Sequence, residues 1–346
     1  MAARQDAIIV INMKNIRYLT GFSGSDGALL VSETEMILLF DGRYTNQVKR
    51  EVTGIATAEY REKSEGIARI IGEKGYQHVG FEAEYCSFSL LARVRQRVDN
   101  GIQLSPLGEL DAIRAIKDEY ELSCIRQAAK IVAQAVTGIM ASLPRNATEQ
   151  DLAAEIDYRT RLAGAEAMAF ATIVASGENS ALPHAQPTNR VLSNGDVLLI
   201  DCGAVLGGYA SDETVVFFID RITEKQKLVY QAVKQAQEAA IQEIKAGVTA
   251  RKIDRTARQV LAIYKLEEFF THSTGHGVGL AIHEEPRLAS ISESVLLAGM
   301  VVTVEPGVYL PGEFGIRIEE TVLVKENGCE ILTNIPKIPT IINIGD

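Results

Sequence analysis

The chain has 346 residues, of which 47% are hydrophobic and 23% charged, the proportions of an ordinary globular protein. Its formal charge of −10 argues against a nucleic-acid backbone or an anionic membrane as a partner. No stretch approaches the roughly 18 consecutive apolar residues of a membrane span, and the four cysteines lack a CxxC pair, so we expect a cytoplasmic protein with reduced thiols. The length predicts two domains, because a single core usually stops growing before this size.

The first third of the chain alternates short apolar runs with segments of helical spacing. Helical spacing predicts helices at 44–51 and 66–75. β-Branched and apolar residues, with a tight turn at 24–27, predict strands at 8–12, 27–32, 36–41 and 78–83. We therefore expect a small α/β domain over residues 1–112.

Longer helices follow. Apolar spacing predicts a helix around 111–141, which Pro144 ends. Cap residues and glycine predict further helices at 148–163 after Thr148, at 223–246 between Thr223 and Gly247, and from Thr249 to about Lys265. Strand pairs lie between and after these helices, so we expect an α+β domain over residues 113–346.

Two aspartates interrupt apolar strands in the middle of this second domain. VLLI leads directly into Asp201, and Asp212 precedes the next apolar run. If residues 206–208 form a hairpin turn, the two side chains lie opposite or diagonal on one face, because side chains alternate along a strand. Their carboxylates are then about 5–8 Å apart and repel each other, so they need a proton or cations. A turn or cap role for either aspartate alone stays open.

A second hairpin repeats this pattern of acids that follow apolar strands. VVTV leads into Glu305 and GIRI leads into Glu319, with Arg317 on the same side as Glu319 by the same alternation. Two alternatives stay open, an edge-strand position for Glu305 and a surface ion pair between Arg317 and Glu319.

The segment THSTGHGVGLAIHEEP, residues 271–286, carries three of the five histidines. Its glycines allow close backbone approach around His276. One imidazole and the four carboxylates make a hard, oxygen-rich ligand set that suits two divalent cations, Mn²⁺, Co²⁺ or Zn²⁺, with a water between them. Nucleotide binding and a Ser-His-Asp triad are poorly supported, because the GxGxxG, P-loop and GxSxG motifs are all missing.

Four motifs of the second domain together resemble the metallopeptidase family of Xaa-Pro aminopeptidases and Xaa-Pro dipeptidases (prolidases): SGENSALPHAQPT, IDCGAVLGGYASDET, STGHGVGLAIHEEP and TVEPGVYLPGEFGIRIEE. NIRYLTGFSGSDGALLVS and LLFDGRYTNQ resemble the smaller N-terminal domain of the same family. The resemblance implies a pita-bread catalytic domain of α+β class, preceded by a creatinase-type α/β domain.

Carried over position by position, the resemblance implies a dinuclear metal site. Asp201 is then a ligand of one metal ion, and Asp212 and Glu319 bridge both ions. His276 and Glu305 bind the second ion. Glu305 also handles the proton of the nucleophilic water.

The resemblance also assigns residues around the metals. His184 steadies the developing oxyanion or the leaving nitrogen, and His272 and His283 stand beside the reacting groups as further catalytic residues. His184, His283, Arg287 and Arg317 bind substrate, Arg287 by holding the free carboxylate of a dipeptide. A structural role for His184 in its loop and a solvated surface position for Arg287 stay open.

The implied activity is hydrolysis of the Xaa-Pro bond at the N-terminus of peptides or in dipeptides, by a hydroxide that bridges two metal ions. Manganese is the expected metal, and a homodimer is the expected assembly. Two alternatives are a catalytically silent pita-bread binding protein and a metal-independent creatinase-like hydrolase, both of which lack the acidic set that this chain retains. Val215 and Glu320 depart from the family pattern of arginine and aspartate, which bears on rate and substrate range.

Overall fold

A computed structural model of the chain describes residues 5–108 and 110–344. The chain divides into two compact units, Met1–Arg114 and Ala115–Asp346. The sequence prediction places the boundary between residues 112 and 113. The outer limits of the two predicted domains, residues 1 and 346, lie outside the described residues.

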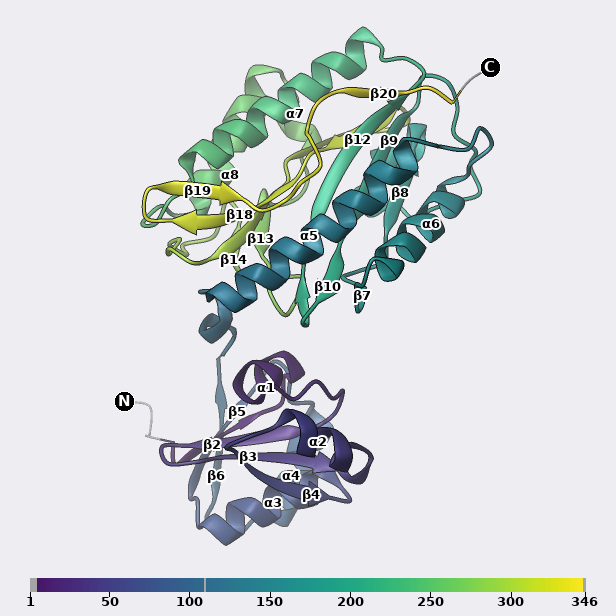
Figure 1. The fold of residues 1–346 in the computed structure, drawn as a ribbon. Coiled ribbons are helices and arrows are strands. Elements are labelled where there is room, and N and C mark those ends of the chain that lie inside the picture. Colours follow the sequence, from purple (N-terminus) through teal and green to yellow (C-terminus); the bar gives the residue numbers. More distant parts are fainter. Residues whose placement is uncertain (1–4, 109, 345–346) are drawn as a thin grey trace. The chain divides into compact units, whose positions relative to one another are not determined.

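The first unit is built on a six-stranded sheet with the order β4-β3-β2-β1-β5-β6 (Figure 1). Strand β1 pairs antiparallel with β2 and parallel with β5, so the sheet is mixed. The strands are β1 (Ala7–Val10), β2 (Ala28–Ser32), β3 (Met36–Asp41), β4 (Ala56–Tyr60), β5 (His78–Glu82) and β6 (Gln103–Leu107). The helical segments are α1 (Met13–Thr20), η1 (Gly42–Tyr44), α2 (Thr45–Glu51), α3 (Lys63–Lys74), α4 (Phe88–Arg97) and η2 (Asp111–Arg114).

The sequence prediction missed helices α1 and α4 and strands β4 and β6. Helix α1 buries one aliphatic side chain, that of Ile16, and the prediction instead continued the first strand to residue 12. Helix α4 buries Leu90 and Val94. Strands β4 and β6 lie at the two edges of the sheet, and most of their side chains are exposed or half-buried. The missed elements are short, with eight and ten residues in the two helices and five in each strand, so each one offers too few repeats for the sequence pattern to reveal it.

The second unit combines long helices with several sheets. Its helical segments are α5 (Glu119–Met140), α6 (Glu149–Leu162), η3 (Gly177–Ala181), α7 (Glu224–Glu243), α8 (Ala250–Ile263) and η4 (Glu267–Phe269). A sheet of order β20-β12-β9-β8 contains β8 (Ile173–Ser176), β9 (Val197–Cys202), β12 (Glu213–Ile219) and β20 (Thr340–Ile342). A sheet of order β14-β13-β15-β18-β19 contains β13 (Gly275–Gly277), β14 (Glu284–Leu288), β15 (Val301–Val304), β18 (Glu320–Lys325) and β19 (Gly328–Ile331). Smaller sheets join β7 (Ala167–Met168), β10 (Ala204–Leu206) and β11 (Tyr209–Ala210), and β16 (Gly307–Leu310) with β17 (Phe314–Arg317).

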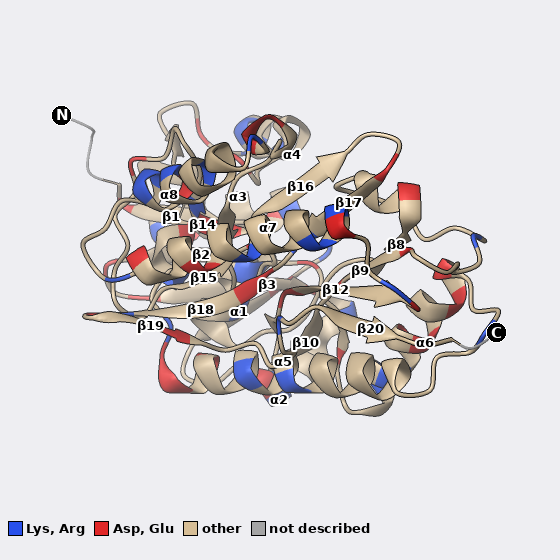
Figure 2. Cartoon of the chain, turned by 90° about the horizontal axis from the view of Figure 1, so that it is seen from above, with Lys and Arg blue, Asp and Glu red and all other residues tan. Residues whose placement is uncertain are grey.

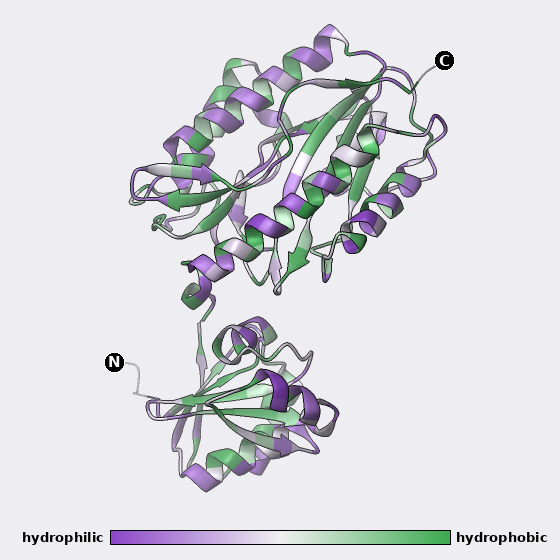
Figure 3. Cartoon of the chain, viewed as in Figure 1, coloured by the Kyte–Doolittle hydropathy of each residue, from purple (hydrophilic) through white to green (hydrophobic). Residues whose placement is uncertain are grey.

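The sheets of the second unit lie between two pairs of helices, α5 with α6 and α7 with α8 (Figure 1). Strand β9 therefore buries both of its faces. Leu199 belongs to the cluster on the side of α7 and α8, and Ile200 belongs to the cluster on the side of α5 and α6. Figure 3 shows the result as apolar strands flanked by helices whose polar and apolar sides alternate.

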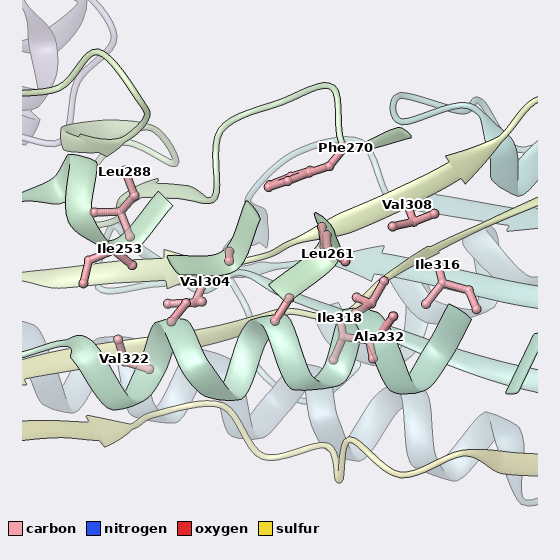
Figure 4. Close-up of a cluster of buried hydrophobic side chains, with 14 of the residues drawn as sticks. Ala232, Ile253, Leu261, Phe270, Leu288, Val304, Val308, Ile316, Ile318 and Val322 are labelled. Carbon is pink, nitrogen blue, oxygen red and sulfur yellow. The ribbon is translucent and has the colours of Figure 1, made fainter. Parts of the chain in front are cut away.

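The larger cluster of buried side chains brings the α7 and α8 helices onto the strands (Figure 4). Ala232 of α7 and Leu261 of α8 are fully buried beside Val304 and Ile318, two residues that directly precede predicted metal ligands. Burial of a leucine, valine or isoleucine side chain is worth about 1.5–3 kcal/mol relative to exposure. The predicted ligands Glu305 and Glu319 thus directly follow residues of this buried cluster.

The structure corrects two predicted helix boundaries. The helix predicted around 111–141 begins only after Asp118, whose side chain accepts from Glu121 N at 2.9 Å while Glu121 Oε2 accepts from Asp118 N at 2.8 Å. The helix that starts after the predicted cap Thr223 ends early, at Glu243, because Ile244 turns to an extended conformation and is fully buried. Gly247 is therefore not the C′ residue of that helix, and its φ of +84° lies in the connection to α8.

Charged side chains of both signs are spread along the helices, as α5 and α7 show in Figure 2. Over the part of the chain that the structure describes, every helix is too short or too polar to cross a lipid bilayer. All four cysteines are free thiols.

Candidate metal centre

A β-hairpin brings the two aspartates together. Strands β9 and β12 pair antiparallel with Asp201 opposite Thr214, so Asp212 lies diagonal to Asp201 on the same face. The hairpin closes through β10 and β11 at Gly207 and Gly208, whose φ angles of +59° and +86° suit a two-residue turn that requires left-handed backbone at both positions.

Glu319 reaches the aspartates from the second sheet. It directly precedes β18, and its N–H donates to Thr214 O at 3.1 Å, which joins β12 to the start of β18. Thr214 Oγ1 in turn donates to Glu319 Oε2 at 2.7 Å. One ligand atom from each of Asp201, Asp212 and Glu319 lies within 4.8 Å of the other two. The two aspartates are therefore closer than the predicted 5–8 Å, and Glu319 joins them from a distant part of the chain.

His276 and Glu305 complete the cluster on its other side. His276 Nε2 lies 3.6 Å from Asp212 Oδ2 and 3.5 Å from Glu305 Oε1. The other ring nitrogen, Nδ1, is 3.0 Å from Gly277 O, and His276 N donates to Thr303 Oγ1 at 3.1 Å. These contacts fix the ring so that Nε2 faces the carboxylates.

The glycines beside His276 allow neighbouring strands to approach closely. A Cβ atom on Gly275 would lie 2.0 Å from Thr303 O, and one on Gly277 would lie 2.4 Å from Glu285 O. Both distances are far below a normal contact, so β13 can sit between β14 and β15 only without side chains at these positions.

Burial and mutual repulsion set the protonation of the cluster. Burial, reinforced by Glu319 and then Asp201, raises the pKa of Asp212 well above its ordinary value. The pKa of Glu319 is raised in the same way by burial, Glu305 and Asp201, and burial raises the pKa of Glu305 to about 8. Burial lowers the pKa of His276 to about 4, so this imidazole is neutral at pH 7 and can act as a ligand.

These residues fit a pair of divalent cations. Asp201 Oδ1 is buried and has no hydrogen-bond partner among the described residues, which is a costly arrangement unless a cation binds there. Four carboxylates can balance two divalent ions, and a set of carboxylate oxygens with a single neutral imidazole suits hard or intermediate metals.

Arg317 lies beside this cluster with its guanidinium bonded to four protein acceptors. It is 3% exposed and donates to Asp201 Oδ2 at 2.6 Å, Tyr309 OH at 2.7 Å, Thr214 Oγ1 at 3.2 Å and Pro183 O at 3.2 Å. The sequence prediction placed Arg317 among the substrate-binding residues. In the structure its partners are a predicted metal ligand, strands β12 and β16, and the loop at Pro183.

The remaining predicted site residues lie around the cluster. The rings of His276 and His283 are 4.4 Å apart, and partial burial followed by the nearby His184 lowers the pKa of His283. His184 itself is exposed. His272 Nε2 lies 2.9 Å from Tyr309 OH, so this ring is held by the protein.

Arg287 is exposed beside the histidine loop. Its Nε donates to Ser273 Oγ at 3.4 Å, and its positive charge contributes, after burial and the nearby His184, to the lowered pKa of His283. The guanidinium is therefore close to the predicted pocket and still accessible to a ligand.

Sequence reasoning missed an ion pair on α8 that holds the histidine loop. Arg258 donates to Asp254 Oδ2 at 2.8 Å and to His272 O at 2.6 Å. Asp254 accepts from Thr274 Oγ1 at 2.9 Å, and Thr274 O accepts from Glu305 N at 2.8 Å. The sequence contains an indication of this role, because Asp254 lies next to Ile253 on the buried face of an amphipathic helix, and a buried acid needs a partner.

Sequence reasoning also missed a glutamate that anchors the loop of His184. Glu149 is fully buried and accepts from Ser176 N and Oγ at 2.6 and 2.7 Å, from Asn179 Nδ2 at 2.8 Å, and from Thr188 N and Oγ1 at 2.9 and 2.7 Å. These donors flank His184 on both sides. Glu149 directly follows the cap Thr148, a position where an acid usually only stabilises the first turn of a helix, so the sequence did not single it out.

We expect the metal-free protein to become more stable as the pH falls from about 8.5 to 6.5. The folded state holds the pKa of Glu305 near 8, above its ordinary 4.5, so in this window the folded protein takes up a proton that the unfolded chain does not bind. Below pH 6.5 the trend weakens, because His276 is protonated in the unfolded chain but not in the folded one. Calorimetric unfolding in EDTA measures the effect. With saturating Mn²⁺ we expect the reverse slope, since protons compete with the ions. A flat profile in EDTA would contradict the predicted repulsion.

Two family models match the chain over most of its length. Residues 123–326 match metallopeptidase family M24, and residues 1–116 match the creatinase/prolidase N-terminal domain. An Xaa-Pro dipeptidase from Pyrococcus horikoshii is 33% identical over 332 residues, 95% of this chain and 92% of the relative. The solved Xaa-Pro dipeptidase from Bacillus anthracis has a TM-score of 0.94 at 34% identity and covers 97% of this chain and 95% of its own. An X-Pro aminopeptidase structure from Thermotoga maritima MSB8 has a TM-score of 0.90 at 37% identity, with 98% of both chains covered.

Proposed function

The chain belongs to metallopeptidase family M24, and from that premise we propose that it hydrolyses the Xaa-Pro bond at the N-terminus of peptides or in dipeptides. The observation that carries the proposal is the convergence of Asp201, Asp212 and Glu319 within 4.8 Å, with His276 beside them. Relatives with both dipeptidase and aminopeptidase names support proline at the second position. A silent binding protein or a metal-independent hydrolase would not need this acidic cluster.

We assign the ions to Asp201, Asp212, His276, Glu305 and Glu319, with Mn²⁺ expected and Co²⁺ or Zn²⁺ as alternatives. Bound there, two divalent ions would polarise the scissile carbonyl and make a water acidic enough to attack at neutral pH.

The protein's own groups would then orient the substrate and move protons. Glu305 is assigned to take a proton from the attacking water at its carboxylate and deliver it to the proline nitrogen as the bond breaks. His184 and His283 would donate hydrogen bonds to the oxygen that gains charge. In a dipeptide, Arg287 would pair with the free carboxylate. His272, fixed by Tyr309, would border the pocket.

We propose a different role for Arg317 from the one that the sequence suggested. Its bond to Asp201 Oδ2 holds this carboxylate while Oδ1 has no partner among the described residues, so Arg317 would set the orientation of this ligand. Four protein acceptors leave it little capacity to bind a peptide carboxylate.

The organisation of the protein completes the proposal. Residues 1–112 are assigned to the creatinase-type domain and residues 113–346 to the pita-bread domain. We also propose that the protein is a homodimer and that it is located in the cytoplasm. The free thiols of all four cysteines support the proposed compartment.

The assay that tests the function compares Xaa-Pro and Xaa-Ala dipeptides and tripeptides on the Mn²⁺-loaded protein. We expect hydrolysis of the proline peptides only, and cleavage of the dipeptide but not the tripeptide would identify a prolidase. EDTA should stop turnover and Mn²⁺ should restore it. The proposal would be wrong if alanine peptides were cleaved equally well, or if an Asp212→Asn variant kept full activity.

A further inference from the structure

A buried lysine lies directly behind two of the predicted metal ligands. Lys337 is 7% exposed, and its ammonium forms a short ion pair with Glu213 Oε1 and lies 3.7 Å from Glu320 Oε2. It also donates to Ile335 O at 2.9 Å. Thr333 Oγ1 forms a short hydrogen bond with Glu320 Oε2, which adds a second link from the same C-terminal segment.

The two glutamates are the chain neighbours of ligands. Glu213 follows Asp212, and Glu320 follows Glu319. Because side chains alternate along a strand, each ligand faces the cluster while its neighbour faces away from it. The segment that carries Lys337 therefore contacts both strands on the face opposite to the cluster. It does so at Glu213 and Glu320, the neighbours of Asp212 and Glu319.

These strands belong to different sheets, so their relative position depends on the contacts between them. Glu319 N donates to Thr214 O at 3.1 Å, and Thr321 Oγ1 donates to Asp212 O at 2.7 Å. Glu213 and Glu320 carry like charges at the same junction and would push the strands apart. The ammonium of Lys337 lies between the two carboxylates and attracts both of them, which offsets their mutual repulsion.

We propose that Lys337 is a positioning residue of the metal centre, which holds β12 and β18 at the separation that lets Asp212 and Glu319 share the same ions. This inference rests on the proposed function, because it requires ions at that cluster. It also accounts for Glu320, which stands where the family pattern has aspartate. The longer side chain reaches both Thr333 and Lys337.

The test is a titration of the metal-free Lys337→Met variant with Co²⁺. Calorimetry measures the affinity, and the visible absorption of the bound Co²⁺ reports the geometry of its ligands. We expect an affinity at least about tenfold weaker than that of the native protein, the usual loss when a group that orients a ligand is removed. The absorption spectrum should change, and kcat should fall about tenfold while KM for an Xaa-Pro dipeptide changes less than about twofold. Glu320→Asp, which keeps the charge, should lose only part of the affinity.

Two further variants separate positioning from loss of stability. If Lys337→Met does not fold, Glu213→Gln/Lys337→Met removes both charges of the pair and is titrated instead. Ile139→Ala on α5 opens a cavity in the core and should lower the unfolding temperature without changing the Co²⁺ spectrum. Native affinity and spectrum in the folded lysine variant, or the same affinity loss in Ile139→Ala, would overturn the proposal. Failure of the native protein to bind Co²⁺ would instead refute the proposed function.

Discussion

Replacement of Asp212 by asparagine is expected to abolish peptide hydrolysis and, in the metal-free protein, to raise the unfolding temperature. Loss of the proposed bridging ligand would remove several kcal/mol of transition-state stabilisation, which corresponds to a fall of about a thousandfold or more in kcat/KM. The gain in stability follows because burial and the neighbouring acids Glu319, Asp201 and Glu305 raise the pKa of Asp212 well above its ordinary value. A neutral amide relieves that repulsion, and a gain of about 1 kcal/mol would raise the unfolding temperature by about 2–4 °C.

Calorimetry with and without Mn²⁺ checks both halves of this prediction. Mn²⁺ should raise the unfolding temperature of the native protein, because the ions bind the folded state. The same Mn²⁺ concentration should raise that of Asp212→Asn far less. Asp99→Asn makes the same chemical change at an exposed position and should alter neither activity nor stability. A metal-free Asp212→Asn variant that unfolds at a lower temperature than the native protein would show that the acids do not repel one another.

Gly275→Ala is expected to give the largest loss of stability among single-atom changes near the site. The added Cβ would lie 2.0 Å from Thr303 O, a backbone atom that cannot rotate away. Strands β13 and β15 would have to separate, at a cost of about 3 kcal/mol or more, and the unfolding temperature should fall by about 6–12 °C. Because His276 is bonded to Thr303, the same shift should weaken Co²⁺ binding.

A second glycine gives the matched control. A Cβ on Gly72, inside helix α3, meets no atom within 4 Å, so Gly72→Ala should be neutral or stabilising by up to about 1 kcal/mol. Equal unfolding temperatures for Gly275→Ala and the native protein would mean that the strands accommodate a methyl group, contrary to the proposed packing.

Much of the site follows from short-range patterns. The family and the fold class predicted from the motifs are confirmed by the matched family models and by the solved relatives. Alternation along the strands was sufficient to put Asp201 and Asp212 on one face, because a hairpin with a Gly-Gly turn permits few registers. The ligand assignment itself stays a prediction.

The residues that support the site were beyond the sequence pattern, because their roles depend on contacts between distant segments. Glu149 and Asp254 lie in helices, where an acid is usually a cap or a surface residue, and only the packed structure shows which loop each one holds. Lys337 lies in a segment without regular periodicity, 124 residues along the chain from Glu213. Arg317 was noticed, but alternation gives only the face on which it lies and not its partner.

The order in which the chain is synthesised has a consequence for this centre. Asp201 and Asp212 emerge from the ribosome well before Glu305, Glu319 and Lys337, so a nascent chain exposes the first pair of acids without the residues that complete the cluster. Ion capture should therefore wait until the segment through Lys337 has left the ribosome. A chain that has been synthesised only through Asp212 carries the two aspartates without the other proposed ligands.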